Sequence, residues 1–374
     1  MRSLTSLILR LARALLPASR RQWGDAAIRE TQEIGHAGTA LWFALGCLIW
    51  AGREAIQDRL QKPRTFGETL MNLSGQRPGA YTIAILCSCA ATGLGLAYMV
   101  MGGAPGRYLA INGGAFAFGL VALAILTLAD RRGHLAAGPV TLSLGLILLA
   151  TSLWGVTGGE VTRWLALGPL MIQPSLMVVP LMAVLFARSR DTLSLTGVVL
   201  GALALALQPD RGMAGALAAA LAVLAIIRPN RAALTAAAAA GVGFGATMLQ
   251  ADRSPAMPFV DQILYSSFDI HPLAGAAVVL GLVLLVLPAL EAARVDPAGR
   301  SVYAVFGAVW TGIIAAAALG NHPTPLVGYG GSAVIGYLIS LVVFHRQAPE
   351  RGRFAVETAA DPERDGPALY TTGP

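Results

Sequence analysis

Long apolar runs, separated by short intervals that carry most of the charge, are the feature that most restricts the fold of this sequence. A bilayer core of about 30 Å needs roughly 20 apolar residues of α-helix to cross it. Charged residues make up only 13% of the 374 residues, whereas a soluble domain carries about a quarter. We therefore predict an all-α fold, a polytopic membrane helical bundle. Its ten predicted transmembrane helices lie near residues 81–101, 108–128, 136–154, 174–187, 193–207, 212–227, 232–249, 272–290, 302–319 and 326–344.

Arginines in alternate loops predict the orientation of the bundle. If the helix at residue 81 starts from the cytoplasm, the inside loops carry two arginines each and the outside loops carry one or none, which agrees with the positive-inside rule. Both termini are then cytoplasmic. The net charge of +7 is explained by these loops and not by a nucleic-acid partner. The inside arginines are Arg131, Arg132, Arg188, Arg190, Arg228, Arg231, Arg294 and Arg300, and the outside ones are Arg107, Arg163, Arg211 and Arg253.

The first eighty residues differ from the rest of the chain. Residues 38–52 are apolar but number only fifteen, and basic residues flank them on both sides. A helix crossing here would place one basic flank outside, so we predict an interfacial or buried helix on the cytoplasmic face. Residues 1–80 are thus a cytoplasmic or interfacial amphipathic prefix, residues 81–345 the transmembrane domain, and residues 346–374, which are polar, a disordered cytoplasmic tail.

No cofactor is expected from the sequence. The three cysteines all lie inside apolar stretches, which fits small core residues better than a disulfide framework or a metal site. A phosphate-binding glycine loop and zinc-ligand spacing are both lacking, and a divalent cation is not indicated.

Four segments on the predicted outer face place polar residues at membrane depth or at helix ends, where they are costly in lipid and are candidates for function. Each also has a structural explanation, such as an interfacial tryptophan anchor, a helix cap, a solvated loop carboxylate or a tight glycine turn. They contain Arg163-Trp164 with Gln173-Pro174-Ser175; Gln208-Pro209-Asp210-Arg211-Gly212; Asp261 and Asp269 in the loop 251–271; and Pro323, Pro325 and Tyr329-Gly330-Gly331-Ser332.

Taken in this order, the segments resemble the SEDS family (shape, elongation, division and sporulation), which contains the FtsW, RodA and SpoVE proteins. The resemblance covers residues 81–344. It implies a peptidoglycan glycosyltransferase that polymerises lipid II at the outer face of the bacterial cytoplasmic (inner) membrane, in cell division or cell-shape control. A loop aspartate would be the general base, for which Asp261 and Asp269 are the candidates. The substrate-binding candidates are Arg163, Trp164, Gln173, Ser175, Gln208, Asp210, Arg211, Tyr329, Gly330, Gly331 and Ser332.

The sequence also departs from the family pattern. Leu176 and Val179 occupy the positions of a glutamate and a lysine, Gly328 replaces a serine, and the outside loop that holds the family's catalytic aspartate is cut to about twenty residues. Three functions therefore stay open. They are a glycosyltransferase with a reduced catalytic loop, a non-catalytic relative that binds a polyprenyl-linked saccharide or scaffolds a membrane transpeptidase, and a lipid II flippase.

Overall fold

The computed structural model describes residues 2–16, 20–34, 36–61, 79–158, 161–168, 170–250 and 255–347. The chain divides into two compact units. The first comprises Met1–Arg77 with Ala293–Arg300, and the second comprises Pro78–Ala292 with Ser301–Pro374. Of the predicted tail, residues 348–374 lie outside the described residues, and residues 346 and 347 end a 3₁₀ helix.

The N-terminal part of the first unit contains three helices, α1 (Arg2–Leu15), α2 (Arg21–Glu33) and α3 (Ala37–Gln61). Its small apolar core joins Ala12 and Leu16 to Ala51, with Cys47 and Leu48 packed against it. The opposite face of α3 is open, since Trp42 is 77% exposed and Ile49 is 75% exposed. The apolar run 38–52 thus buries only one of its faces within this unit.

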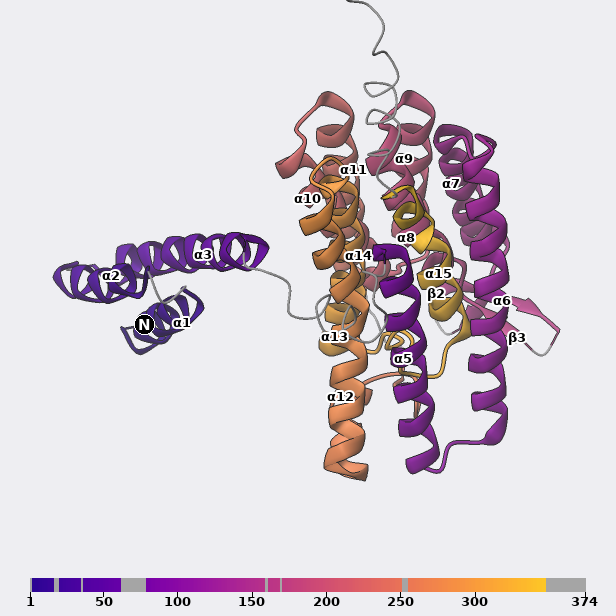
Figure 1. Ribbon diagram of the computed structural model, residues 1–374, viewed down its shortest axis with the longest axis horizontal. Helices are drawn as coiled ribbons and strands as arrows, with labels where there is room; N and C mark the ends of the chain where they lie inside the picture. Colours follow the sequence, from indigo (N-terminus) through magenta and orange to yellow (C-terminus); the bar gives the residue numbers. More distant parts are fainter. Residues whose placement is uncertain are drawn as a thin grey trace, which may run out of the picture. The chain divides into compact units, whose positions relative to one another are not determined.

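The second unit is a bundle of long helices that lie side by side (Figure 1). Its helices match the ten predicted spans to within a few residues, except at the start of the last. Five of them, α5, α6, α7, α13 and α14, are long and apolar enough to cross a bilayer by length and composition alone. The helices are α5 (Ala80–Met101), α6 (Gly106–Arg131), α7 (Ala137–Trp154), α8 (Pro174–Ser189), α9 (Thr192–Leu207), α10 (Arg211–Ile227), α11 (Arg231–Met248), α13 (Pro272–Val295), α14 (Arg300–Leu319) and α15 (Gly331–Ser340).

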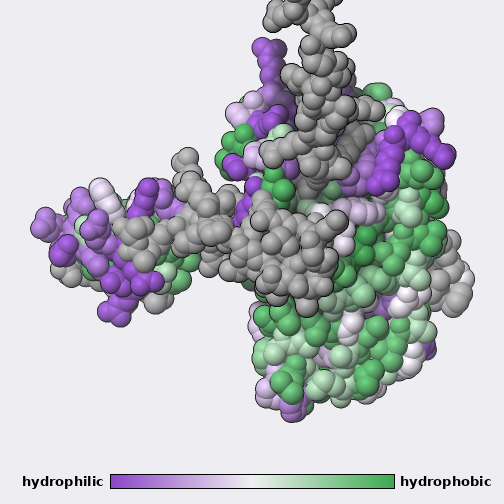
Figure 2. All heavy atoms as spheres, viewed as in Figure 1, coloured by the Kyte–Doolittle hydropathy of each residue, from purple (hydrophilic) through white to green (hydrophobic). Residues whose placement is uncertain are grey.

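The surface of the second unit confirms a polytopic membrane protein. Figure 2 shows hydrophobic side chains over much of its visible face and hydrophilic ones toward its ends. Helix α8 is buried at nearly every position from Pro174 to Ala187, so it occupies the interior of the bundle. Small residues bring the helices together: a Cβ atom on Gly145 of α7 would lie 2.2 Å from the carbonyl oxygen of Gly197 on α9.

The connections on the predicted outer face contain structure that the sequence patterns did not predict. The segment after α7 forms a three-stranded antiparallel sheet of β1 (Val156–Gly158), β2 (Val161–Leu167) and β3 (Leu170–Ile172). Gly168, at a φ of +60°, follows β2 in the turn to β3. The loop 251–271 contains a short helix, α12 (Ile263–Ile270). The last helix begins at Gly331 and not at residue 326, because residues 321–330 form a buried turn-rich loop.

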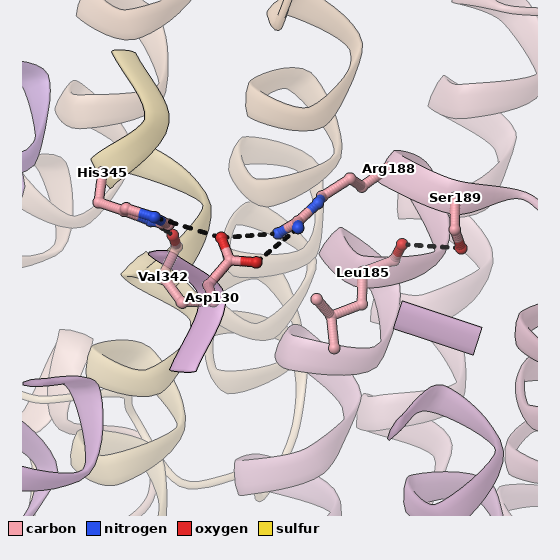
Figure 3. A network of polar contacts seen from close by, with 6 residues as sticks. All are labelled: Asp130, Leu185, Arg188, Ser189, Val342 and His345. Carbon is pink, nitrogen blue, oxygen red and sulfur yellow. Dashed lines mark hydrogen bonds and ion pairs between the residues drawn. The ribbon is translucent and has the colours of Figure 1, made fainter. Parts of the chain in front are cut away.

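A buried ionic cluster joins three elements at the predicted cytoplasmic end of the bundle. Asp130, near the end of α6, accepts hydrogen bonds from both terminal nitrogens of Arg188 on α8, at 2.5 and 3.1 Å. His345, in the 3₁₀ helix η2 (Leu341–Gln347), places Nε2 3.2 Å from the same carboxylate. Figure 3 shows Asp130 between these two side chains. The cluster ties the end of the last helix to α6 and to the buried α8.

Candidate functional site

Asp210 lies at the centre of a buried polar cluster on the predicted outer face. It precedes α10 and caps that helix, because its Oδ1 accepts from the backbone N–H of Met213 at 3.3 Å. Its Oδ2 accepts from Ser175 Oγ at 2.7 Å and from Gln173 Nε2 at 3.1 Å. All three of these polar side chains are at most 3% exposed. The two motifs that carry a Gln-Pro pair, far apart in the sequence, therefore meet at one carboxylate.

The last outside motif joins this cluster at two points. The backbone N–H of Gln173 donates to Ser332 Oγ at 3.0 Å. His322 places Nε2 3.9 Å from Asp210 Oδ1, and its ring packs directly on Gly212. A Cβ atom on Gly212 would lie 2.2 Å from Cδ2 of that ring, so only glycine fits there. The glycine of the Gln-Pro-Asp-x-Gly motif thus makes room for His322.

The Arg-Trp pair lies on strand β2, and Arg163 belongs to the same site. The guanidinium of Arg163 lies 4.5 Å from the ring centre of Trp164, in a cation–π contact. Arg163 is only 4% exposed, and its Nε has no hydrogen-bond partner among the described residues. Its positive charge acts on His322 and helps to lower the pKa of that imidazole. Arg163, His322 and Asp210 therefore belong to one electrostatic cluster.

Of the two aspartates predicted as general base, only Asp261 is near this cluster. Its negative charge also acts on His322, and its Oδ2 accepts from the backbone N–H of Met257 at 2.9 Å, which closes a tight turn. Asp269 lies exposed on α12. Phe259 and Gln262, which flank Asp261, have φ values of +63° and +56°. Non-glycine residues in this left-handed region are strained, and such strain gathers at functional sites.

The tyrosine of the Tyr-Gly-Gly-Ser motif is part of an aromatic stack. Tyr329 stacks on Tyr108 of α6 with ring centres 3.8 Å apart and planes 7° apart. One turn along α6 from Tyr108, Asn112 accepts from the backbone N–H of Gly330 at 3.1 Å and donates to the carbonyl of Gly328 at 2.8 Å. The loop is thereby fixed to α6. No sequence motif includes Tyr108 or Asn112, and His322, although it lies in the fourth outer-face segment, is not a predicted site residue, because the partners of all three come from distant segments.

The remaining predicted site residues have mainly structural contacts. Gln208 Nε2 donates to the carbonyl of Leu148 at 2.7 Å. Arg211 reaches the end of α11, where Nη2 donates to the carbonyl of Gln250 at 2.8 Å. Gly331 packs against Ala115 of α6, since a Cβ atom there would lie 3.0 Å from that side chain. Arg211 therefore extends toward α11, whereas Arg163 faces His322.

Leu176 and Val179 lie at the two positions where the resemblance to the SEDS family implies a charged pair. Both side chains are buried on α8, at 2% and 0% exposure. Close to them, α15 packs against α8 so tightly that a Cβ atom on Gly336 would lie 2.1 Å from the carbonyl oxygen of Leu176. An apolar helix contact occupies this part of the interior.

Over the described ranges, no group of three or more His, Cys, Asp and Glu side chains is placed to hold a metal ion.

Comparisons with known proteins agree with the fold. The chain matches no protein-family model and no curated protein. Its structure is similar to the crystal structure of the rod shape determining protein RodA from Thermus thermophilus, at 22% identity and a TM-score of 0.53, over 70% of this chain and 94% of that one. A mutant of the same RodA, with one aspartate changed to alanine, aligns over the same shares at 22% identity and a TM-score of 0.50. The fold implied by the resemblance to the SEDS family is therefore confirmed: the fold of this chain is similar to that of RodA, in a divergent form.

Proposed function

We propose that this chain is a SEDS-like protein of peptidoglycan synthesis in the bacterial cytoplasmic membrane, and that it extends glycan chains from lipid II or another polyprenyl-linked saccharide. The observation that carries the proposal is the convergence of three separate motifs on Asp210. Gln173, Ser175 and His322 lie around Asp210 of the Gln-Pro-Asp segment. Ser332, at the start of α15, accepts a hydrogen bond from the backbone of Gln173. Buried polar groups in a membrane protein are costly and mark functional sites.

The proposed reaction needs a base and a cation. A carboxylate takes the proton from the acceptor hydroxyl, whose oxygen then bonds to the anomeric carbon as the bond to the pyrophosphate breaks. Asp261 is the proposed base, because its charge reaches the cluster and Asp269 is exposed on α12. Arg163 is the cation proposed to face the departing pyrophosphate. Its buried Nε, which has no partner in the described part of the chain, supports this role.

The test is polymerisation of fluorescent lipid II by the purified full-length protein in proteoliposomes, with and without candidate transpeptidase partners. We expect glycan products from the wild type, a loss of at least about 100-fold for Asp261→Asn, and near wild-type rates for Asp269→Asn, the matched control. Failure of the wild type with every partner would overturn the proposal. Movement of lipid II across the bilayer without extension would support a flippase instead.

A groove on the bundle favours a second candidate function, a non-catalytic scaffold for a membrane transpeptidase. The groove, of about 420 Å³, lies between α12, α13 and α14 and is lined by apolar side chains. Val283 is 57% exposed and Leu290 is 45% exposed there. A partner's transmembrane helix would fit such a surface, since helices in lipid associate through close packing. The lining residues include Leu264, Val279, Leu282, Val286, Leu287 and Ile314.

A photo-crosslinking amino acid at position 283 tests this scaffold function. We expect it to capture a single-pass transpeptidase in membranes, whereas the same probe at Val242, which is 75% exposed on α11, captures none. Equal capture at both positions would show that the groove is not selective.

A further inference from the structure

His322 is a buried histidine whose ring nitrogens lack well-formed hydrogen bonds. The residue is 4% exposed, and among the described residues neither ring nitrogen makes a hydrogen bond of good length and angle, although the backbone of Pro323 lies near enough to affect the ring. The gap of 3.9 Å between Nε2 and Asp210 Oδ1 is too long for a hydrogen bond. Buried polar side chains in native proteins nearly always have partners, so this exception calls for an explanation.

Charged groups from three elements act on the ring. Asp210 acts from the start of α10, Arg163 from β2, and Asp261 from the loop before α12. Burial has the largest effect and lowers the pKa of His322 below its ordinary value of 6.5. The two aspartates and the backbone of Pro323 oppose that shift, and Arg163 adds to it. The buried position therefore favours the neutral imidazole, because a second positive charge beside Arg163 would be poorly solvated.

The loop that carries His322 is bonded to the loop that carries Asp261. The backbone N–H of Thr324 donates to the carbonyl of Val260 at 3.0 Å, and the N–H of Tyr329 donates to the carbonyl of Phe259 at 2.6 Å. A side-chain bond of 2.7 Å, from Gln262 Nε2 to Asn321 Oδ1, adds a third connection. The position of His322 therefore influences that of Asp261 through these bonds.

We propose that His322 is a positioning residue of the outer-face site: its neutral ring, packed on Gly212 beside Asp210, holds the loop 321–330 in place and thereby positions Asp261. The inference rests on the proposed function only for the role given to Asp261. Its structural part concerns the two loops and holds for a saccharide-binding relative as well.

Protonation weakens this arrangement. The packed form has the lower pKa, so it binds fewer protons than a form in which His322 is in water. The stability of the packed form is therefore fully present above the ordinary histidine pKa of 6.5, and it falls as the outside pH drops below that value. We expect the two loops to loosen together on acidification.

Hydrogen exchange of the full-length protein in lipid nanodiscs, between about pH 5 and pH 8, tests this directly. After correction for intrinsic rates, protection of the Thr324 and Tyr329 amides in the wild type should fall several-fold toward acidic pH. In His322→Gln, which keeps a polar side chain that cannot titrate, protection should not change with pH. His271→Gln, at an exposed histidine next to α12, should keep the wild-type dependence.

Two charge variants sharpen the test. Asp210→Asn removes a negative charge that raises the pKa of His322, so the loss of amide protection should move to lower pH. Arg163→Gln removes a positive charge that lowers the pKa of His322, so the loss of amide protection should move to higher pH. A flat wild-type profile, or a transition that persists in His322→Gln, would overturn the inference. Because the measurement needs no substrate, a protein that titrates as described but does not polymerise lipid II would refute the reaction and leave the role of His322 intact.

Discussion

The hydroxyl of Ser175 donates a 2.7 Å hydrogen bond to the carboxylate of Asp210, which lies 35 residues later in the chain and on a different helix. This bond joins two short motifs in one buried site, although neither motif by itself is specific for a function. Gln173 adds a second bond to the same carboxylate oxygen. Mutations can test this site, the histidine beside it, the opposite end of the bundle and the N-terminal unit.

Replacing Asp210 should destabilise the protein more than replacing an ordinary helix cap. Asp210→Ala leaves the buried hydroxyl of Ser175 without its acceptor, which costs about 1–3 kcal/mol, and it removes one of the two acceptors of Gln173 Nε2, the other being Ser175 Oγ at 3.1 Å. Asp191→Ala is the matched control, since Asp191 caps α9 through Ser194 but is exposed. It should cost about 1 kcal/mol. Thermal unfolding in detergent compares the two, and equal shifts would contradict a special role for the Asp210 cluster.

A methyl group on Gly212 should force His322 out of its position. A Cβ atom added to Gly212 would lie 2.2 Å from the ring, which is far too short a contact to tolerate, so Gly212→Ala should lower stability by about 1–3 kcal/mol. His322→Ala removes the ring, and the double variant should recover most of that loss. Gly241→Ala on α11, where nothing lies within 4 Å, should be neutral or slightly stabilising. Additive losses in the double variant would argue against the contact.

At the predicted cytoplasmic end, Asp130→Asn should strongly destabilise the bundle. It leaves the charge of Arg188 without its partner in a largely buried site, and breaking such a pair costs about 3–5 kcal/mol. The change should also loosen η2, because His345 contacts the same carboxylate. Asp25→Asn, which breaks the exposed pair with Arg13 in the N-terminal unit, is the control and should have little effect. Thermal unfolding measures both, and similar shifts would contradict the prediction.

The open face of α3 should contact the bilayer surface. Trp42 and Ile49 are seven residues apart and therefore lie on one side of the helix, where tryptophan and basic flanks favour the interface. With Cys47, Cys87 and Cys89 changed to serine, a fluorescent label at Ile49→Cys should be quenched by brominated lipid in proteoliposomes that contain anionic lipid. A label at Glu33→Cys, at an exposed residue of α2, should be quenched by aqueous iodide instead. Iodide quenching of both labels would contradict interfacial binding.

Apolar length and small-residue content were enough to predict the helices of the bundle. Backbone groups in lipid must be satisfied within the segment, so an apolar run long enough to cross becomes a helix whatever its neighbours do. Helices α5 to α11, α13 and α14 accordingly begin and end within a few residues of the predicted spans. The small sheet around Arg163 and the helix α12 were not predicted, because such short segments are stabilised by contacts with the rest of the bundle and not by their own sequence pattern.

The candidate site was only partly visible in the sequence. The motifs at Gln173, Asp210 and Ser332 identified the residues that meet, yet the choice between Asp261 and Asp269 could not be made from their spacing. His322 lies in the fourth outer-face segment but was not among the predicted site residues, since a histidine between a loop asparagine and a proline has no pattern of its own.

The sequence by itself therefore determined a multi-pass helical bundle and the set of outer-face motifs that resembles the SEDS family, because both depend on local composition and on residue order. Only the tertiary structure decided which of these residues share one site. Hydrogen bonds and charge effects act over a few ångströms, and packing of distant helices brought His322 to Asp210 and Gly212, placed Asp261 near them, and directed Arg211 toward α11.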